Sequence, residues 1–334
     1  MTMNRVARLV KRPAPGLVTP ECFEIADEAV PEPGDGEFRV RAEYVSLDPA
    51  MRGWINEGKS YVPPVSLGEV MRAFSAGTVE ASRHPDFKEG DQVVGLFGVQ
   101  THAISDGTRV QKVDPEIAPL QSWIGGLGMP GLTAYFGLLR VGAAKEGDTV
   151  VVSAASGAVG SLVGQIAKLK GCRAVGIAGG PEKCRALIEE DGFDAAVDYK
   201  AGDLGAQLDA ACPNGIDVDF ENVGGDILDA ILPRMNPFGR IAVCGLISAY
   251  TATSLPPGPK NIRFVLTMRL KMQGFIVFDF AEDNATALAD LGQWVKAGKL
   301  RLREDVREGG VDAFVDTLNL LYTGGNFGKL SLKV

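Results

Sequence analysis

The spacing of hydrophobic positions changes near residue 122. Before that point, positions 38, 40, 42 and 44 are apolar or aromatic, and charged residues fill the positions between them. An alternation with period two is typical of a half-buried strand. Turn clusters rich in Pro, Gly and Asp follow at short intervals, for example at 31–36 and 88–91. We therefore predict that residues 1–122 form a mostly β region with a barrel-like antiparallel fold.

After residue 122, short apolar runs alternate with helical patterns. The runs lie near 149–155, 173–179, 195–199, 216–221 and 240–245, and the helical patterns include 183–191 and 225–235. A sixth strand is predicted at 272–278 and a further helix near 283–297. This alternation is typical of βαβ units in a parallel sheet with helices on both faces, so the fold class is α/β with a doubly wound sheet.

The C-terminal segment has a third pattern. Its apolar positions at 311, 314, 315, 318 and 321 predict an amphipathic helix, and 330–334 predicts a last strand that returns to the first region. A chain of 334 residues is also longer than one hydrophobic core usually supports. We predict two domains, one of residues 1–122 and 299–334 and one of residues 123–298.

Composition narrows the class of protein. Hydrophobic residues make up 46% and charged residues 23%, as in ordinary globular proteins, and the net charge is −8. An acidic chain without a basic face argues against a nucleic-acid partner. Residues 1–16 lack the apolar core of a signal peptide, and no apolar run is long enough to cross a membrane. We expect a cytoplasmic protein without a membrane partner.

The potential metal ligands are few and scattered. The five cysteines form no CxxC pair, and the two histidines, His84 and His102, have no neighbouring cysteine or histidine. This spacing fits neither a zinc ribbon nor a disulfide framework. We predict that no metal is bound and that both histidines lie at the surface or in turns.

A glycine-bearing turn follows the predicted strand at 149–155. Ala155 stands at the first position of a GxGxxG motif, and Gly157 and Gly160 hold the other two. In the helix that follows, positions 159, 162, 163 and 166 are apolar on one face, and positions 161, 165 and 168 are polar on another. Such a strand, turn and helix aim backbone N–H groups at a pyrophosphate. The alternative is a close-packed structural turn.

The end of the second predicted strand bears on the choice of dinucleotide. NAD-binding folds place an acid about 20 residues beyond the turn, where this chain has Gly179 and Gly180. A nearby cation without an acid suits a 2′-phosphate, which makes Lys183 a candidate for NADP selection. Tyr199, after the next strand, is a second candidate. The alternative is that Lys183 is an ordinary solvated charge.

Five motifs give the chain a resemblance to a known family. They are Gly-Met-Pro-Gly-Leu-Thr-Ala-Tyr at 128–135, Ala-Ala-Ser-Gly-Ala-Val-Gly at 154–160, Phe-Glu-Asn-Val-Gly-Gly at 220–225, Cys-Gly-Leu-Ile-Ser at 244–248 and Gly-Asn-Phe-Gly-Lys at 325–329. With the predicted domain order, they resemble the zinc-independent branch of the medium-chain dehydrogenases/reductases, the group of prostaglandin reductases, plant double-bond reductases and bacterial curcumin reductase. The resemblance implies a GroES-like catalytic domain, a Rossmann domain that binds NADP (NADPH), and a homodimer.

The implied activity is the reduction of the C=C bond of α,β-unsaturated ketones or aldehydes. Hydride goes to the β-carbon and a proton to the α-carbon, while charge builds up on the carbonyl oxygen. Tyr250 follows the fifth predicted strand at the carboxyl edge where ligands bind, and we predict that it donates to the enolate. One alternative is that Tyr250 orients the ribose hydroxyl that gives the proton, and another is a structural tyrosine packed over the cofactor.

Further site residues come from the same motifs. The predicted cofactor residues are Thr133, Ser156, Gly157, Ala158, Val159, Gly160, Lys183, Tyr199, Asn222, Cys244, Gly245, Tyr250, Phe275, Ile276, Val277 and Asn326. Arg52 and Tyr61 are predicted to contact the substrate, and Tyr61 is a second catalytic candidate. The alternatives are a structural ion-pair partner for Arg52 and a loop tyrosine packed beside Pro63 and Pro64 for Tyr61. Ala50 stands where many relatives carry tyrosine in Asp-Pro-Tyr-Met-Arg, which predicts a reshaped substrate pocket.

Two other functions remain open. A quinone reductase of the same superfamily would share the cofactor site and differ in its electron acceptor. A non-catalytic NADP(H)-binding redox sensor would keep the dinucleotide site without turnover. The motifs on the nicotinamide side argue against the sensor.

Overall fold

The computed structural model describes residues 3–254 and 256–334. Met1 and Thr2, at the start of the stretch inspected for a targeting signal, lie outside the described residues. The chain divides into two compact units, one of Met1–Gly125 and Glu304–Val334 and one of Gly126–Arg303. We call them unit 1 and unit 2 and describe each by itself. Within the described residues, no helix combines the length and the apolar character needed to cross a membrane.

Unit 1 is mostly β. Its strands are β1 (Met3–Leu9), β2 (Phe23–Ala29), β3 (Phe38–Ser46), β4 (Ser75–Ser82), β5 (Gln92–Gly95), β6 (His102–Ser105), β7 (Gln111–Lys112), β14 (Glu304–Arg307) and β15 (Lys329–Lys333). Its helices are η1 (Pro20–Cys22), α1 (Met51–Trp54), η2 (Leu120–Ile124), η6 (Val311–Ala313) and α10 (Phe314–Thr323). The main sheet has the order β14-β15-β3-β4-β5-β7, with β6 also paired to β3. Only β14 and β15 pair in parallel, so the prediction of an antiparallel β region is confirmed.

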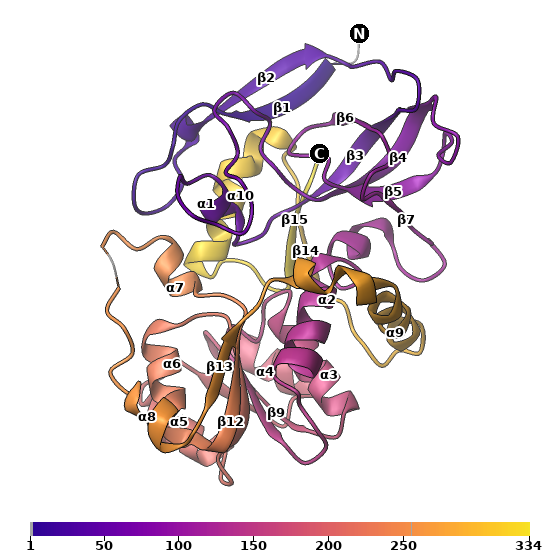
Figure 1. The fold of residues 1–334 in the computed structure, drawn as a ribbon. Coiled ribbons are helices and arrows are strands. Elements are labelled where there is room, and N and C mark those ends of the chain that lie inside the picture. Colours follow the sequence, from indigo (N-terminus) through magenta and orange to yellow (C-terminus); the bar gives the residue numbers. More distant parts are fainter. Residues whose placement is uncertain (1–2, 255) are drawn as a thin grey trace. The chain divides into compact units, whose positions relative to one another are not determined.

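The C-terminal segment returns to this unit, as predicted. Strand β15 pairs antiparallel with β3, and α10 lies beside the strands of unit 1 (Figure 1). The apolar face of α10 joins a core formed with β1 and β2, in which the ring of Phe314 meets that of Phe23 edge to face at 5.1 Å. Burial of that face explains the helical spacing seen in the sequence.

Unit 2 holds a parallel sheet in the order β10-β9-β8-β11-β12-β13. The strands are β8 (Thr149–Val152), β9 (Arg173–Ala178), β10 (Ala195–Asp198), β11 (Ile216–Glu221), β12 (Met235–Val243) and β13 (Lys271–Gly274). The helices are α2 (Met129–Phe136), η3 (Gly137–Val141), α3 (Gly160–Leu169), α4 (Pro181–Glu189), α5 (Leu204–Ala211), α6 (Gly225–Ile231), η4 (Leu232–Arg234), α7 (Ile247–Tyr250), α8 (Arg263–Thr267), η5 (Val277–Asp283) and α9 (Asn284–Lys296). Numbered from β8, this order is 3-2-1-4-5-6, which is the Rossmann order.

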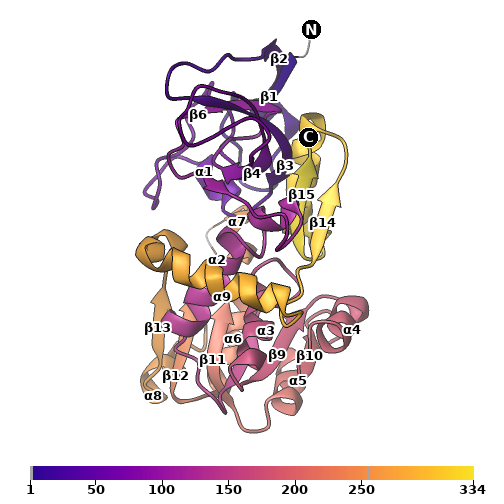
Figure 2. The same cartoon turned by 90° about the vertical axis from the view of Figure 1, so that its right-hand side faces the viewer.

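Helices cover the sheet of unit 2 on both faces. On one face, the ring of Phe193 packs so closely on α3 and β9 that a Cβ at Gly164 or Gly176 would lie 1.8 or 3.0 Å from it. On the other face, Leu208 of α5 and Ile227 of α6 share a core with β8, β9 and β12. Figure 2 shows α9 beside α2, and both contribute to a further apolar cluster. The doubly wound α/β prediction is confirmed.

Two local predictions differ from the structure, and the surroundings of one helix face are a further finding. The sixth strand ends at Gly274, because η5 begins at Val277, so it is shorter than predicted. Strand β12 starts at Met235, earlier than predicted, and its pairing shifts near the sequence Pro-Phe-Gly at 237–239. On the polar face of α3, Ser161 and Gln165 are buried while Lys168 is exposed, and Gln165 exchanges hydrogen bonds with the backbone of Arg301 at 2.7 and 3.1 Å. Such pairing makes burial of the amide possible.

Candidate cofactor and substrate site

The turn after β8 has the close packing that a phosphate-binding turn needs. Ala154 adopts a left-handed φ of +49°, and its carbonyl oxygen would lie 2.4 Å from a Cβ at Gly160. Glycine is therefore required where α3 begins. A Cβ at Gly157 would meet the same oxygen at 3.3 Å, which is less severe. The predicted residues at 156–160 thus form the turn and the first position of a ten-residue helix, whose N-terminal N–H groups favour an anion.

A buried carboxylate holds the neighbouring strand end. Glu221 accepts hydrogen bonds from the hydroxyl of Ser153 at 2.5 Å and from the backbone N–H groups of Val223 at 2.5 Å and Gly224 at 2.9 Å. Asn222 donates from its side-chain amide to the Ser153 carbonyl at 2.7 Å, which ties β11 to β8. Burial raises the pKa of Glu221, and these bonds oppose the rise. Glu221 and Ser153 were missed because each reads as an ordinary strand residue.

Gly179, the residue that follows β9, lies against Tyr199 and Lys200, the two residues that follow β10. A Cβ at Gly179 would lie 2.8 Å from the ring of Tyr199 and 2.9 Å from Cε of Lys200. The carboxylate of Asp198 accepts the N–H groups of Gly180 and Lys200, each at 2.9 Å, which lowers its pKa. Lys200 was not predicted, although a basic residue directly after the candidate Tyr199 is a signal that could have identified it.

Lys183 lies in the first turn of α4 and is half-buried. It stands three residues after Gly180, whose φ of +99° leads the chain into the helix. Its predicted role in NADP selection stays a prediction.

A hollow of about 450 Å³ lies at the carboxyl ends of β12 and β13. It is lined by Val243, Cys244, Gly245, Leu246, Tyr250, Gly274, Phe275, Ile276 and Asp279. Five of these residues belong to the predicted site, while Val243, Leu246, Gly274 and Asp279 do not. Such hollows at the carboxyl edge of a parallel sheet are the usual ligand sites of this architecture.

Tyr250 has its hydroxyl at the edge of the β12 loop. The N–H of Leu246 donates to this hydroxyl at 3.3 Å, and a Cβ at Gly245 would lie 3.2 Å from it. Gly245 therefore leaves the room that the hydroxyl occupies. Burial, aided by the charge of Glu221, raises the pKa of the Cys244 thiol to about 12, so this cysteine is no nucleophile at neutral pH.

The other predicted residues of unit 2 surround this hollow or support it. The ring of Phe275 lies over Gly137, where a Cβ would approach it to 2.4 Å. Val277 is buried in the cluster formed by α2 and α9, outside the lining of the hollow. The hydroxyl of Thr133 donates to the Met129 carbonyl at 2.7 Å within α2.

In unit 1, Tyr61 is held by a residue that sequence reasoning missed. The indole N–H of Trp54 donates to the Tyr61 hydroxyl at 2.7 Å. Trp54 is buried at the end of α1, and Arg72 lies over its ring with Cζ 5.9 Å from the centroid. The ring of Tyr61 is 47% exposed, so its hydroxyl is fixed while much of its surface stays accessible.

Arg52 is buried rather than open to a ligand. Its guanidinium donates to the Asn56 side chain at 2.6 Å and to the carbonyls of Ala14 and Gly16 at 2.9 and 3.2 Å. Burial lowers its pKa. The arginine therefore joins the 14–16 segment to α1, the helix that carries Trp54.

Asn326 lies in the 325–328 segment that leads into β15. Its amide donates to the Gly328 carbonyl at 3.2 Å, and the N–H of Phe327 donates to Asp305 of β14 at 2.9 Å. Gly328 has a φ of +91°, so the segment turns sharply before the strand begins. This geometry fixes Asn326 as part of an ordered turn.

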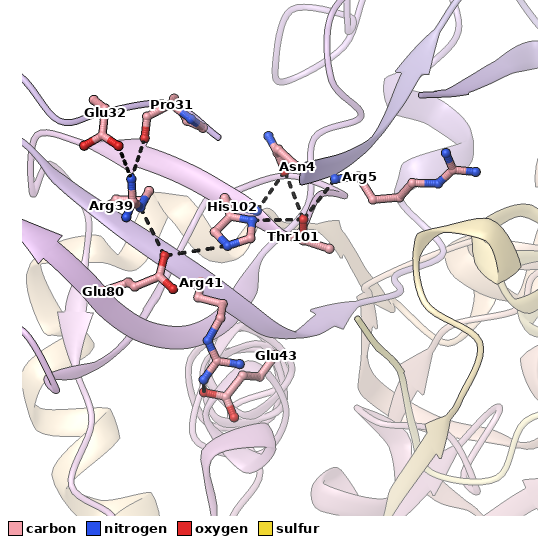
Figure 3. A network of polar contacts seen from close by, with 10 residues as sticks. All are labelled: Asn4, Arg5, Pro31, Glu32, Arg39, Arg41, Glu43, Glu80, Thr101 and His102. Carbon is pink, nitrogen blue, oxygen red and sulfur yellow. Dashed lines mark hydrogen bonds and ion pairs between the residues drawn. The ribbon is translucent and has the colours of Figure 1, made fainter. Parts of the chain in front are cut away.

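The two histidines differ. His84 lies in a turn, as predicted, with its ring edge to face against Phe38 and Phe87. The prediction was wrong for His102, which is buried in β6 and bonded to Thr101 at 3.1 Å, with Glu80 at 3.6 Å (Figure 3). Burial lowers its pKa although Glu80 opposes the effect. Figure 3 shows this residue inside a structural network with Asn4 and Arg39.

Within residues 3–254 and 256–334, no group of three or more histidine, cysteine or acidic side chains is arranged to hold a metal ion. The five cysteines are free thiols. The residues of unit 2 fit a dinucleotide instead: a tight turn before a helix N-terminus, a glycine pair next to a lysine and a tyrosine, and a hollow at the carboxyl edge.

Comparisons with known proteins agree with this architecture. Residues 5–113 match a family described as the N-terminal domain of oxidoreductase, and residues 158–293 match one described as zinc-binding dehydrogenase. The chain is 47% identical to NADPH-dependent curcumin reductase of Escherichia coli, over 99% of this chain and 97% of the relative. It is 42% identical to prostaglandin reductase 1 of Bos taurus, over 95% of each chain.

A solved structure gives the same result for the fold. The crystal structure of CurA in complex with NADPH from Vibrio vulnificus superposes with a TM-score of 0.93, at 46% identity and over 99% of each chain. The identity to full-length relatives covers both units and all five motifs. The chain therefore belongs to the medium-chain dehydrogenase/reductase superfamily, in the group of curcumin and prostaglandin reductases.

Proposed function

We propose that this protein reduces the C=C bond of α,β-unsaturated ketones and aldehydes with NADPH. The observation that carries the proposal is the hollow at the ends of β12 and β13, with the Tyr250 hydroxyl beside it and the phosphate turn in the same unit. The similarity to NADPH-dependent curcumin reductase supports the cofactor and the class of reaction. We assign dinucleotide binding to residues 123–298 and substrate contacts to residues 1–122 and 299–334.

In this proposal, the residues of the chain bind NADPH, orient the substrate and protonate the enolate. When bound, NADPH supplies the hydride that adds to the β-carbon of the substrate. The turn at 156–160 would hold the pyrophosphate, and Cys244, Gly245, Phe275 and Ile276 would line the space for the nicotinamide half. We assign Thr133 and Val277 supporting positions for the cofactor. Asn222 and Asn326 supply amide groups for the ribose and carboxamide.

Tyr250 is the proposed donor to the enolate. Its hydroxyl accepts the N–H of Leu246, which fixes the oxygen and leaves the phenolic proton as the donated one. A positioned general acid of this type typically contributes about 10²–10⁴-fold to the rate. The raised pKa of the Cys244 thiol also protects the site. An enone is an electrophile that alkylates thiolates, and this thiol stays protonated at neutral pH.

Tyr61 is the proposed contact to the substrate carbonyl. The Trp54 indole occupies an acceptor position of its hydroxyl, which strengthens the hydroxyl as a donor through hydrogen-bond cooperativity. Arg52 supports this arrangement, because its guanidinium bonds hold α1 in place and thereby hold Trp54, the last residue of α1.

The preference for NADPH rests on the ends of β9 and β10. We infer that Lys183, Tyr199 and Lys200 surround the 2′-phosphate. Gly179 leaves room for the Tyr199 ring, and two backbone N–H groups engage the nearby Asp198 carboxylate. A cationic pair suits a phosphate and gives a bare ribose hydroxyl no advantage, and the Asp198 carboxylate beside it is already engaged by the N–H groups of Gly180 and Lys200.

The experiment is an assay of purified protein with 3-nonen-2-one, using NADPH and NADH in parallel. We expect oxidation of NADPH with the saturated ketone as product, and label from [4-²H]NADPH on the β-carbon. An allylic alcohol as product, or label elsewhere, would contradict the proposal. Tight NADPH binding without turnover of any activated alkene would instead favour the sensor, and turnover restricted to quinones would favour the quinone reductase.

We also propose that the protein is a homodimer of the cytoplasm. Strand β13 ends the sheet of unit 2 with all four residues exposed, and Leu266 and Phe238 nearby are 79% and 66% exposed. An exposed edge strand beside apolar side chains is a template for pairing with a second copy. Light scattering should give twice the chain mass, and Leu266→Lys with Met272→Lys should lower it. The free thiols are typical of a reducing compartment.

A further inference from the structure

A buried ammonium joins two segments of unit 1. The side chain of Lys329 is 3% exposed, and that of its partner Asp48 is 7% exposed. Its Nζ donates to the Ser46 hydroxyl at 2.6 Å, to the Leu47 carbonyl at 3.0 Å and to Asp48 Oδ1 at 2.8 Å. The Ser46 hydroxyl in turn donates to Asp48 Oδ2 at 2.5 Å. All three donors of the ammonium are therefore engaged.

The strands themselves do not need this ammonium. Pairing of β15 with β3 is already set by backbone register, from Ser331 opposite Ser46 to Lys333 opposite Tyr44. Lys329 is the first residue of β15, before this pairing begins. Its side chain reaches the last residue of β3 and the start of the loop to α1. The ammonium therefore acts on the segments that flank the strands.

One of those segments is the 325–328 turn that carries Asn326. On its other side, β14 holds the turn through the bond from the Phe327 N–H to Asp305 and through a bond from Arg307 to the Gly325 carbonyl at 3.4 Å. Lys329 fixes the end of the turn that enters β15. The orientation of Asn326 thus depends on anchors at both ends of the turn.

A second carboxylate lies beside Lys329 but accepts no hydrogen bond from its ammonium. Glu304 of β14 is the cross-strand neighbour of Lys329, and a Cβ at Gly125 would lie 3.1 Å from Lys329 Cγ and 3.3 Å from Glu304 Oε1. In the described part of the chain, neither carboxylate oxygen of Glu304 has a hydrogen-bond partner. Asp48 is the carboxylate that pairs with the ammonium. The corner thus contains one matched ion pair directed at the loop start.

We propose that Lys329 is a positioning residue: its ammonium sets the 325–328 turn against the Ser46–Asp48 corner and thereby sets the affinity for NADPH through Asn326. This inference rests on the proposed function, because it takes Asn326 as a cofactor residue. Among the described residues, the hydrogen bonds and the ion pair of its ammonium go to Ser46, Leu47 and Asp48, so Lys329 is a positioning and not a catalytic residue.

The test compares four variants: Lys329→Met, Asp48→Asn, the double variant, and Lys333→Met. Methionine keeps the apolar stem and removes the charge. Lys333→Met is the matched control, because Lys333 lies on the same strand and pairs with Glu308 at the surface at 3.2 Å. NADPH affinity is measured by the fluorescence of the bound nucleotide well below each Tm, and the kcat and KM values are measured with 3-nonen-2-one.

We expect Lys329→Met to weaken NADPH binding by about tenfold, or about 1.4 kcal/mol. The double variant should regain thermal stability, since no unpaired buried carboxylate remains, but should not regain NADPH affinity. Lys333→Met should bind as the unchanged protein does. If Lys329→Met does not fold, Ser46→Ala decides, because it removes the 2.6 Å bond and keeps the ion pair; a measurable loss of NADPH affinity is expected there too.

Two results would overturn the inference. One is unchanged NADPH affinity in Lys329→Met, or in Ser46→Ala where that variant decides. The other is affinity that returns with Tm in the double variant, which would mark a purely structural role. Failure of the proposed function looks different, because the unchanged protein itself would then fail to reduce the enone, whether or not it binds NADPH.

Discussion

Two segments are held by different means: the 156–160 turn of unit 2, and the corner of unit 1 where Lys329 meets Ser46, Leu47 and Asp48 (the Lys329 corner). In the turn, backbone groups and missing side chains determine the geometry, as the 2.4 Å approach between a Gly160 Cβ and the Ala154 oxygen shows. In the corner, one buried side chain with three donors holds segments that lie far apart in the sequence. The first arrangement is sensitive to added atoms and the second to removed charge, so substitutions can test each separately.

The largest expected effect is at the turn. Gly160→Ala should weaken NADPH binding by at least about a hundredfold, or about 2.7 kcal/mol, because the new Cβ forces the Ala154 carbonyl away from α3. Calorimetric titration with NADPH measures this. Gly157→Ala is the matched control, with a Cβ contact of 3.3 Å, and should lose much less. Equal losses in both variants would mean that packing at Gly160 does not form the site.

The corner makes a prediction about pH and stability. Burial raises the pKa of Glu304 to about 7, with Ser122 and Lys329 opposing the rise, whereas the unfolded chain titrates near 4.5. The folded state keeps a proton that the unfolded state loses, so stability is present below the unfolded pKa and falls as pH rises toward 7. Glu304→Gln removes this loss. It should exceed the unchanged protein by about 2 kcal/mol near pH 8 and by little near pH 5.

Urea unfolding at the two pH values measures that difference. Glu308→Gln, at an exposed position of the same unit, serves as the control and should show no such pH dependence. A Glu304→Gln variant whose advantage is the same at both pH values would show that this carboxyl does not titrate in the expected range.

The sequence predicted features that lie within one segment and did not predict contacts between distant segments. The turn, the six parallel strands and the hollow after β12 follow from local periodicity and glycine spacing, which a single segment contains. The Lys329 corner joins segments almost 300 residues apart, and no local pattern predicts which acid a lysine will meet. The burial of Gln165 was likewise not predicted, because its partner is the backbone of Arg301, outside its own helix.

Tyr250→Phe tests the proposed proton donor at the hollow after β12 in unit 2. Loss of the phenolic proton should lower kcat at least about tenfold if the proton passes through this residue. The KM for NADPH should change little, because the ring remains. The kcat value and its solvent isotope effect are the measurements. An unchanged kcat would assign the proton to water and leave Tyr250 as a packing residue beside Gly245.

Nucleotide selection should give a smaller effect. Lys183→Ala and Lys200→Ala should each raise the KM for NADPH by about fivefold, about 1 kcal/mol, since each removes one cation from a partly solvated phosphate site. The KM for NADH should stay the same. Lys170→Ala, at the end of α3, is the control for an altered net charge. Equal changes with both nucleotides would show that these lysines do not select NADPH.

The smallest effect is expected at Trp54, and it bears on how unit 1 holds a functional side chain. Trp54→Phe keeps an aromatic ring in the core and removes the N–H that donates to Tyr61 at 2.7 Å. A single neutral hydrogen bond is worth about 1 kcal/mol, so kcat/KM for the enone should fall about threefold to fivefold. In a Tyr61→Phe background the same substitution should have no further effect, because the indole acts through that hydroxyl. Additive losses would mean that Trp54 supports the loop by packing alone.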